Sequence, residues 1–151
     1  MDIYELIRTQ MIPAVPFAAH TGIELLEIGP GRAVTRLQQQ PETSNHLGTM
    51  HAGALFTLGE AASGGAMSGT FAEQILSVRP VATAAQITYS RAGRGTLKAD
   101  AHTSKSPGEL QSTLRANGRV SFDIEVTISD AAERSIATMV VAWQVRASHA
   151  A

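Results

Sequence analysis

One carboxylate and one imidazole stand out in the middle of this chain because the residues around them are apolar or small. From Met50 to Ala72 the sequence contains only Ala, Gly, Leu, Ser, Thr, Met and Phe, apart from His51 and Glu60. A helix that is apolar or small on nearly every face is normally buried, and a buried carboxylate is costly unless it has a partner or a task. Glu60 is therefore the first candidate for a catalytic residue.

Glu60 could act in either of two chemical roles, and the backbone at the start of its helix could act in a different one. A carboxylate with few charges nearby is more basic than a solvated one. It suits a general base that activates water, or a nucleophile that forms a mixed anhydride, and the sequence leaves both roles open. The unpaired N–H groups of Ala52 and Gly53, at the positive end of the helix dipole, can stabilise negative charge on a carbonyl oxygen. Glu60 lies nine residues after His51, about two and a half turns into the helix, on one face of a pocket that a second copy would cover.

Each of these residues also has a purely structural interpretation. Glu60 would then be the solvent-facing residue of a helix whose buried stripe is formed by other side chains. His51 would cap the helix, and Asn45 would hold a turn in the loop before it. The buried stripe would consist of Leu55, Leu58, Ala62 and Ala66.

The composition excludes several classes of function. The net charge is −1 and the isoelectric point is about 6.5, so the chain lacks the basic surface typical of nucleic-acid binding. The absence of cysteine excludes disulfides, a thiolate nucleophile and cysteine-ligated zinc. The histidines show no spacing typical of a zinc site, and we expect no metal. They are His20, His46, His51, His102 and His149.

We expect one domain over residues 1–151. The hydrophobic fraction of 44% allows a real core, and no long charged or low-complexity run divides the chain. Residues 50–72 are long enough to cross a membrane, but their five glycines and Glu60 make them too polar for a lipid-facing helix. The first residues have no basic region before an apolar run, so they do not resemble a secretory signal. We therefore expect a cytoplasmic protein with no membrane partner.

Hydrophobic periodicity predicts the elements that position these residues. Residues 3–12 and 106–118 should form short helices. The turn at 29–31 should join two strands, and a loop at 41–50 should lead into the long helix. The expected strands cover residues 22–28, 32–39, 81–90, 97–103, 120–129 and 136–145.

The expected strands and the long helix define an α+β fold with an antiparallel sheet. Residues 136–145 are apolar on both faces, which is typical of a central strand. Each glycine weakens an isolated helix by about 1 kcal/mol relative to Ala, so the sheet should wrap tightly round the glycine-rich helix. One face of the strand at 81–90 should carry Val81, Thr83, Ala85, Ile87 and Tyr89.

Two segments resemble a known family. The stretch NHLGTMHAGALFTLGE, from Asn45 to Glu60, is similar to the motif at the start of the central helix in hotdog-fold thioesterases, specifically the phenylacetate-degradation (PaaI-like) type. The stretch YSRAGRGTLKA, from Tyr89, resembles the strand that ends in Arg in that family and resumes after a glycine. The likeness covers about residues 15–146. One departure is that Ala52 stands where family members usually have the first of two glycines after the histidine.

The resemblance implies a hotdog fold, with about six antiparallel strands wrapped round one long helix. It also implies that two protomers join edge to edge into one longer sheet, with active sites at their interface. In such a site Asn45 and Glu60 act on the nucleophilic water or the acyl carbon. His51 and the N–H groups of Ala52 and Gly53 hold the thioester carbonyl.

The function that we expect is hydrolysis of a small to medium acyl or aryl thioester of coenzyme A, by a homodimer or a dimer of dimers. No cofactor is expected apart from the coenzyme A of the substrate. Arg91, Arg94 and Lys98 are candidates for its phosphates, because Arg pairs well with phosphate oxygens. The alternative interpretation of these three residues is an ordinary charged strand end. The alternatives are an acyl-CoA-binding sensor module, against which Glu60 argues, and an acyl-thioester hydratase on the same fold.

Overall fold

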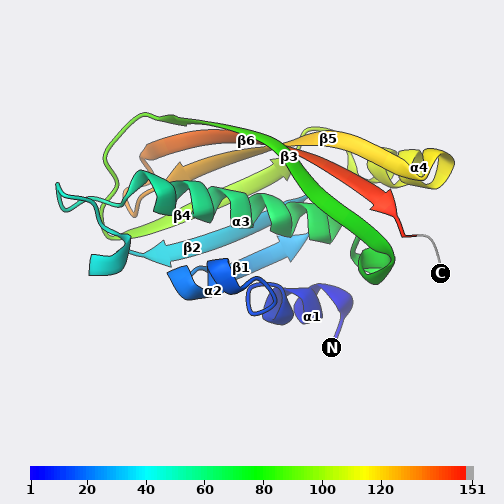
Figure 1. Ribbon diagram of the computed structural model, residues 1–151, viewed down its shortest axis with the longest axis horizontal. Helices are drawn as coiled ribbons and strands as arrows, with labels where there is room; N and C mark the ends of the chain where they lie inside the picture. Colours follow the sequence, from blue (N-terminus) through cyan, green and yellow to red (C-terminus); the bar gives the residue numbers. More distant parts are fainter. Residues whose placement is uncertain (149–151) are drawn as a thin grey trace.

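The computed structural model describes residues 1–148, which form a six-stranded antiparallel sheet and a long central helix, α3 (Figure 1). The strand order is β1-β2-β4-β5-β6-β3. The strands are β1 (Glu24–Gly29), β2 (Arg32–Gln38), β3 (Val78–Tyr89), β4 (Thr96–Thr103), β5 (Arg119–Ser129) and β6 (Ser135–Ala147). The helices are α1 (Ile3–Gln10), α2 (Pro16–Thr21), α3 (Ala52–Thr70) and α4 (Pro107–Asn117), with short 3₁₀ helices η1 (Pro41–Thr43) and η2 (Ala72–Ser77).

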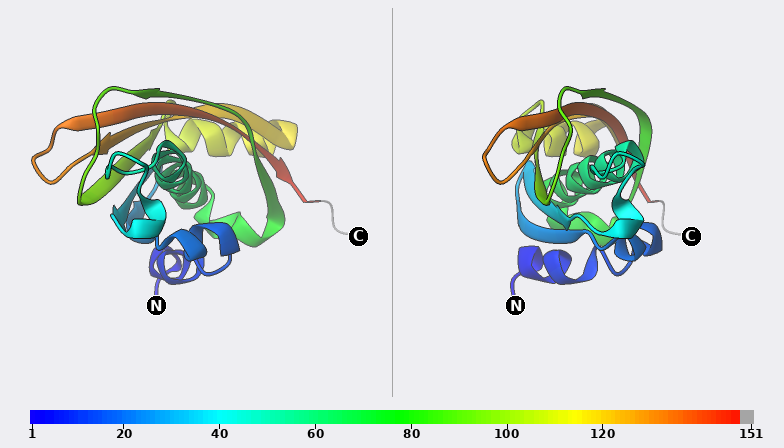
Figure 2. Two further views of the ribbon diagram at one scale, coloured as in Figure 1. Left: turned by 60° about the vertical axis from the view of Figure 1, so that its left-hand side comes forward. Right: turned by 90° about the vertical axis from the view of Figure 1, so that its left-hand side faces the viewer.

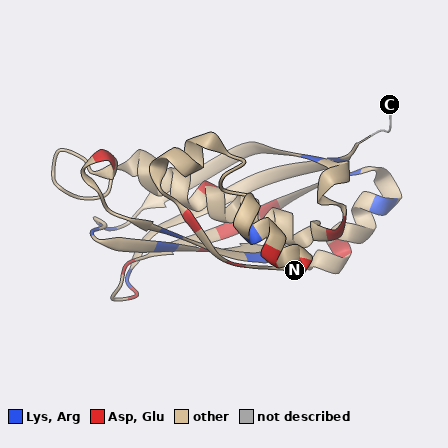
Figure 3. Ribbon diagram, turned by 90° about the horizontal axis from the view of Figure 1, so that it is seen from below, with Lys and Arg blue, Asp and Glu red and all other residues tan. Residues whose placement is uncertain are grey.

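The sheet curves round α3, as the glycine content of the helix predicts (Figure 2). Leu58, Ala62 and Ala66 of α3 are fully buried against the sheet. The expected α+β fold with a wrapped central helix is confirmed. Within residues 1–148, no helix is both long enough and apolar enough to cross a membrane. Acidic and basic residues are spread over several elements rather than gathered on one (Figure 3).

Glycines let α3 approach the strands closely. A Cβ atom on Gly65 would lie 2.7 Å from the Cβ of Ala33 on β2, and one on Gly69 would overlap the carbonyl oxygen of Gly29 on β1. By contrast, a Cβ on Gly64 would meet nothing nearer than 3.8 Å. Close packing against the sheet therefore requires glycine at Gly65 and Gly69, but not at Gly64.

We expect Gly69→Ala to lower the free energy of unfolding by about 2 kcal/mol or more, because backbone must move to admit the methyl group. Gly64→Ala should instead raise it by up to about 1 kcal/mol, since Ala is the better helix former and meets only ordinary contacts there. Urea denaturation of both variants beside the wild type measures the two changes. Equal destabilisation by both would contradict the close approach at Gly69.

The first twenty residues differ from the expectation of one helix at 3–12. Helix α1 ends at Gln10, and a second short helix, α2, follows from Pro16. Six residues are too few to show helical periodicity, so only its boundaries signal α2: Pro16 at its first position and Gly22 in the left-handed conformation (φ 87°) after its end. The short helix η2 after α3 was likewise not expected, and η1 lies within the expected loop at 41–50.

The predicted face of β3 is wrong for Val81. A bulge between Ala82 and Ala84 inserts one extra residue opposite β6, and such an insertion reverses the alternation of side chains. Val81 pairs with Gln144 on the outer face of the sheet, whereas Ile87 pairs with Met139 on the inner face.

Strand β6 is central, between β5 and β3, as predicted from its sequence. Its inner face, with Met139, Val141 and Val145, is buried against α3 and the core. Its outer face is open in the single chain, where Val140 is 41% exposed. The apolar residues on both faces of this strand therefore do not mean that both faces are buried in one chain on its own.

The two edges of the sheet are protected very differently. On β1, Glu24 and Glu27 form ion pairs of 2.8 Å with Arg36 and Arg32 of β2, and a bulge interrupts the strand. Helix α1 also packs against β1. Charges, bulges and cover are the devices that normally stop edge strands from pairing with other chains.

Strand β3, the other edge, has few of these devices. It is twelve residues long, and it carries no charged side chain after Arg79. Residues 81–86 are all exposed. Pro80 and the bulge at Thr83 are its only interruptions. An edge of this kind is suited to pairing with another strand.

Candidate active site

The helix-start loop, residues 44–51, is held by the side chain of Asn45. Its Oδ1 accepts hydrogen bonds from the backbone N–H groups of Leu47 (2.9 Å) and Thr49 (3.1 Å), and its Nδ2 donates to Oγ1 of Thr49 (2.7 Å). Asn45 therefore fixes the path by which the chain enters α3. The second hydrogen of its amide nitrogen is not used in these bonds and is available to a ligand or water.

His51 is the N-cap of α3. Its Nδ1 accepts a hydrogen bond of 2.8 Å from the backbone N–H of Gly53, so in the neutral ring the proton lies on Nε2. The Gly53 N–H is consequently occupied within the chain, which differs from the expectation that it is free. The Ala52 N–H has no hydrogen-bond partner among residues 1–148. The Ala54 N–H also has no partner there, but Ala54 is buried, so the exposed donors at the helix start are Ala52 N–H and His51 Nε2–H.

A cleft of about 380 Å³ lies at this end of α3; we call it the helix-start cleft. The Tyr89 hydroxyl, at the end of β3, donates a hydrogen bond of 3.2 Å to the carbonyl oxygen of Ala52. This contact ties the end of the edge strand to the first residue of α3. The cleft is lined by Asn45, Thr49, Met50, Ala52, Leu55, Tyr89, Ser90, Arg91, Ala92 and Gly93.

The three predicted phosphate ligands lie in different places. Arg91 lines the helix-start cleft. Arg94 donates from Nη1 to the carbonyl oxygen of Gly48 (3.2 Å), so it also supports the helix-start loop. Lys98 points from β4 to the outer face of the sheet, away from α3. The structure thus brings Arg91 to the site, places Arg94 beside it and leaves Lys98 outside it.

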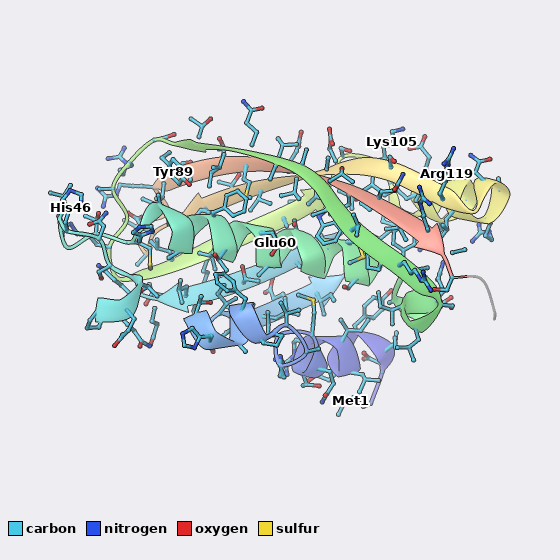
Figure 4. The ribbon with its side chains drawn as sticks, in the orientation of Figure 1. Met1, His46, Glu60, Tyr89, Lys105 and Arg119 are labelled. Carbon is cyan, nitrogen blue, oxygen red and sulfur yellow. The ribbon has the colours of Figure 1, made fainter. Side chains whose placement is uncertain are left out.

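Glu60 lies midway along α3, on a side that the sheet does not cover (Figure 4). Its side chain is partly buried, and this burial raises the pKa of the carboxyl group above its usual value. Among residues 1–148 the carboxylate has no hydrogen bond or ion pair. It borders a second, largely apolar space of about 230 Å³, the Glu60 cavity. The cavity is lined by Met11, Ile12, Val15, Ala18, Glu60, Ala61, Gly64, Met67, Ser68, Pro80 and Trp143.

The candidate residues therefore form two half-sites in one chain. Ala52 and Glu60 are eight residues apart on one continuous helix, which separates them by about 12 Å along its axis. A carbonyl group and the water that attacks it must lie within about 3.5 Å of each other. Within one chain, Glu60 and the helix start line two separate spaces that share no lining residue.

A comparison of sequences supplies the family. The model of the family described as Domain of unknown function (DUF4442) matches residues 4–145. The chain belongs to the DUF4442 family. Among curated proteins, no sequence matches it significantly.

Solved structures share the fold of this DUF4442 chain. A protein from Pseudomonas aeruginosa described as a probable thioesterase is 23% identical, with a TM-score of 0.79 and 95% of each chain covered. The Escherichia coli PaaI protein, from the phenylacetic acid degradation operon, is 19% identical, with a TM-score of 0.71 over 97% of this chain and 94% of its own. A mutant thioesterase enzyme from Staphylococcus aureus is 17% identical, with a TM-score of 0.70 over 87% and 99%. These likenesses confirm the hotdog fold.

Several residues of the DUF4442 chain that line the Glu60 cavity were not singled out from the sequence. Met11 and Val15 come from the N-terminal segment, Pro80 from the start of β3 and Trp143 from β6. They are far apart along the chain, and only the fold brings them together. The sequence contained one signal that could have pointed to Trp143: it is the single tryptophan, and a buried tryptophan needs a hydrogen-bond partner for its Nε1–H. That partner is Oγ of Ser63 at 3.0 Å.

Within residues 1–148, no three His, Asp or Glu side chains lie close enough together to hold a metal ion. The expectation that the protein works without metal or cofactor stays a prediction. The chemistry available at the two half-sites is that of a carboxylate, an imidazole and backbone N–H donors.

The raised pKa of Glu60 predicts how its replacement changes stability. The folded protein holds the Glu60 proton more tightly than the unfolded chain, so stability is favoured below the ordinary pKa of 4.5 and is lost as pH rises through the raised pKa. Glu60→Gln, which cannot ionise, should therefore have a higher Tm than the wild type at pH 7 and an equal Tm near pH 4. Thermal unfolding at both pH values tests this. A gain of the same size at both would mean that ionisation is not its cause.

Proposed function

We propose that this protein hydrolyses acyl-CoA thioesters in a site shared by two copies of the chain, with Glu60 from one copy and the start of α3 from the other. The observation that carries the proposal is the pair of half-sites on one helix. The free Ala52 N–H and the carboxylate with a raised pKa lie at separate spaces, about 12 Å apart along the helix axis. Both nevertheless lie on the part of α3 that its own chain leaves partly open.

The unprotected edge of β3 supports a two-fold pairing of two chains. Two copies of β3 that pair antiparallel would extend the sheet and remove its exposed edge. Near its start β3 carries Pro80, which lines the Glu60 cavity, and it ends at Tyr89, which contacts Ala52. Antiparallel pairing sets the first end of one strand against the last end of the other, so the partner's Ala52 comes to the Glu60 cavity. The expected assembly is this dimer, or a dimer of such dimers.

The chemistry of such a site follows from its donors and its base. The partner's Ala52 N–H and the partner's His51 would donate to the thioester oxygen as it gains negative charge. Ionised Glu60 would take a proton from water while the water oxygen bonds to the carbonyl carbon. The C–S bond then breaks, and the sulfur of coenzyme A takes that proton as it leaves. In the alternative, the Glu60 carboxylate attacks the carbon itself and water hydrolyses the resulting anhydride.

The helix-start cleft would receive the coenzyme A part of the substrate. Arg91 lines this cleft and has a side chain suited to a phosphate group. Asn45 in the same cleft has one amide hydrogen left for the substrate or the attacking water. Arg94 lies beside the loop and Lys98 on the outer face, so we assign the phosphate contact to Arg91 first.

A thiol-release assay over a panel of acyl-CoA thioesters tests the proposal. We expect release of coenzyme A from at least one member of the panel at a rate well above that without enzyme, from a protein that light scattering shows to be a dimer or larger. A fully active monomer would contradict the shared site. Tight binding of acyl-CoA without thiol release would instead favour a binding module.

A further inference from the structure

The Glu60 cavity has the chemistry of a site for an apolar chain. Among the side chains that line it, only Glu60, Ser68 and Trp143 carry nitrogen or oxygen atoms, and the indole N–H of Trp143 is already bonded to Ser63. A polar or charged ligand would lose its hydrogen bonds to water there with few partners in exchange. An apolar ligand, by contrast, would bury its surface against Met11, Met67 and Trp143.

The cavity extends from Glu60 toward the end of α3. Glu60, Gly64 and Met67 follow one another at spacings of four and three residues, so they lie on one face of the helix. Met67 lies about 10 Å beyond Glu60 along the axis. A group whose carbonyl carbon is held beside Glu60 therefore has a path along this face, beneath the N-terminal segment and Pro80.

Trp143 forms a fixed wall of the cavity. Its Nε1–H donates to Oγ of Ser63 (3.0 Å), which in turn donates to the carbonyl oxygen of Glu60 (2.7 Å). The polar atom of the indole is thereby satisfied, and the ring can present carbon atoms to a ligand. A Cβ on Gly64 would lie 3.8 Å from Cζ2 of Trp143 and 3.9 Å from Cε of Met11. Any larger side chain at Gly64 would take up part of the cavity.

We propose that the Glu60 cavity takes the acyl group of the substrate, and that Gly64 leaves room for an apolar acyl group of about six to eight carbons. The size follows from the cavity volume of about 230 Å³. An apolar cavity of about 150 Å³ holds benzene with its six carbons, so the larger Glu60 cavity has room for a group of this size or a few carbons more. This inference rests on the proposed thioester hydrolysis and adds the substrate class to it.

The test compares kcat/KM for acetyl-, butanoyl-, hexanoyl-, octanoyl- and dodecanoyl-CoA. In the wild type we expect kcat/KM to rise about fourfold with each added carbon and to stop rising near octanoyl. Gly64→Leu should lower the ratio of octanoyl to acetyl kcat/KM about a hundredfold. If the leucine variant fails to fold, Gly64→Ala takes its place, because its methyl group meets only ordinary contacts. Gly64→Ala should lower the ratio of octanoyl to acetyl kcat/KM by a smaller factor.

The matched control is Gly108→Leu on α4, where an added side chain meets open space. Its chain-length profile should equal that of the wild type. A profile that both Gly64 variants leave unchanged, with hydrolysis intact, would overturn the acyl site and leave the proposed function standing.

Calorimetric binding of acetyl- and octanoyl-CoA to Glu60→Gln separates the acyl site from catalysis. Tighter binding of octanoyl-CoA, lost in the double variant with Gly64→Leu, supports the acyl site even if no thiol is released by the wild type. In that case only the proposed hydrolysis fails. Equal binding of the two thioesters would overturn the acyl site.

Discussion

Replacement of Glu60 by Gln is expected to lower kcat for the best acyl-CoA substrate by a factor of about a hundred or more. The amide keeps the shape of the side chain, but it can neither accept a proton from water nor attack the thioester. Glu60→Ala should have a similar effect. Steady-state thiol release measures kcat, and circular dichroism confirms that the variants are folded.

The dependence of wild-type activity on pH should also reflect ionisation of the Glu60 carboxylate. Because activity requires ionised Glu60 and burial raises its pKa above 4.5, activity should fall as pH decreases through that raised value. Glu125→Gln, a change on the exposed outer face of β5, serves as the matched control and should keep wild-type kcat. Wild-type hydrolysis by the Glu60→Gln protein would show that another group performs the chemistry.

Ala52→Pro should lower kcat by a factor of about a hundred to a thousand, the loss typical of one oxyanion-hole donor. Proline at the first position of a helix is well tolerated, and here it removes one N–H, that of Ala52, which has no partner within residues 1–148. His51, with φ −62° and ψ 141°, already has the extended conformation that a residue before proline prefers. Gly53→Pro is a poorer test, because the Gly53 N–H is bonded to the His51 ring.

Ala52→Gly is the matched control, since glycine keeps the backbone donor and restores the residue that the resemblance leads one to expect. Its kcat should stay within about tenfold of the wild type. Thermal unfolding checks that the proline variant is folded. If folded Ala52→Pro retains the wild-type kcat, the thioester oxygen must be held elsewhere.

The sequence predicts the fold well where local patterns and global packing agree. The strict alternation in residues 120–129 gave β5, and the glycines of α3 correctly predicted a tightly wrapped sheet. Glu60 was found because it is the only carboxylate in an otherwise apolar helix. Signals of this kind lie within one segment, so one sequence is enough to show them.

Features that depend on contacts between distant segments were missed. The bulge at Thr83 is set by the pairing of β3 with β6, and the Glu60 cavity is formed by residues as far apart as Met11 and Trp143. The bond from Gly53 to the His51 ring depends on the rotamer of one side chain. The separation of Glu60 and Ala52 was implied by their spacing, and the resemblance implied edge-to-edge pairing, but the exposed edge of β3 indicates which strand a second chain would pair with.

The central claim is that each active site combines Glu60 of one chain with the helix start of another, and a hybrid dimer tests it most directly. Glu60→Gln and Ala52→Pro chains, co-expressed with two different affinity tags, allow purification of dimers that contain one chain of each kind. In a shared site, one of the two sites in the hybrid has both groups intact, so we predict about half of the wild-type activity per dimer. If both groups acted within one chain, every site would carry one defect, and activity no higher than that of the parent variants would contradict the account.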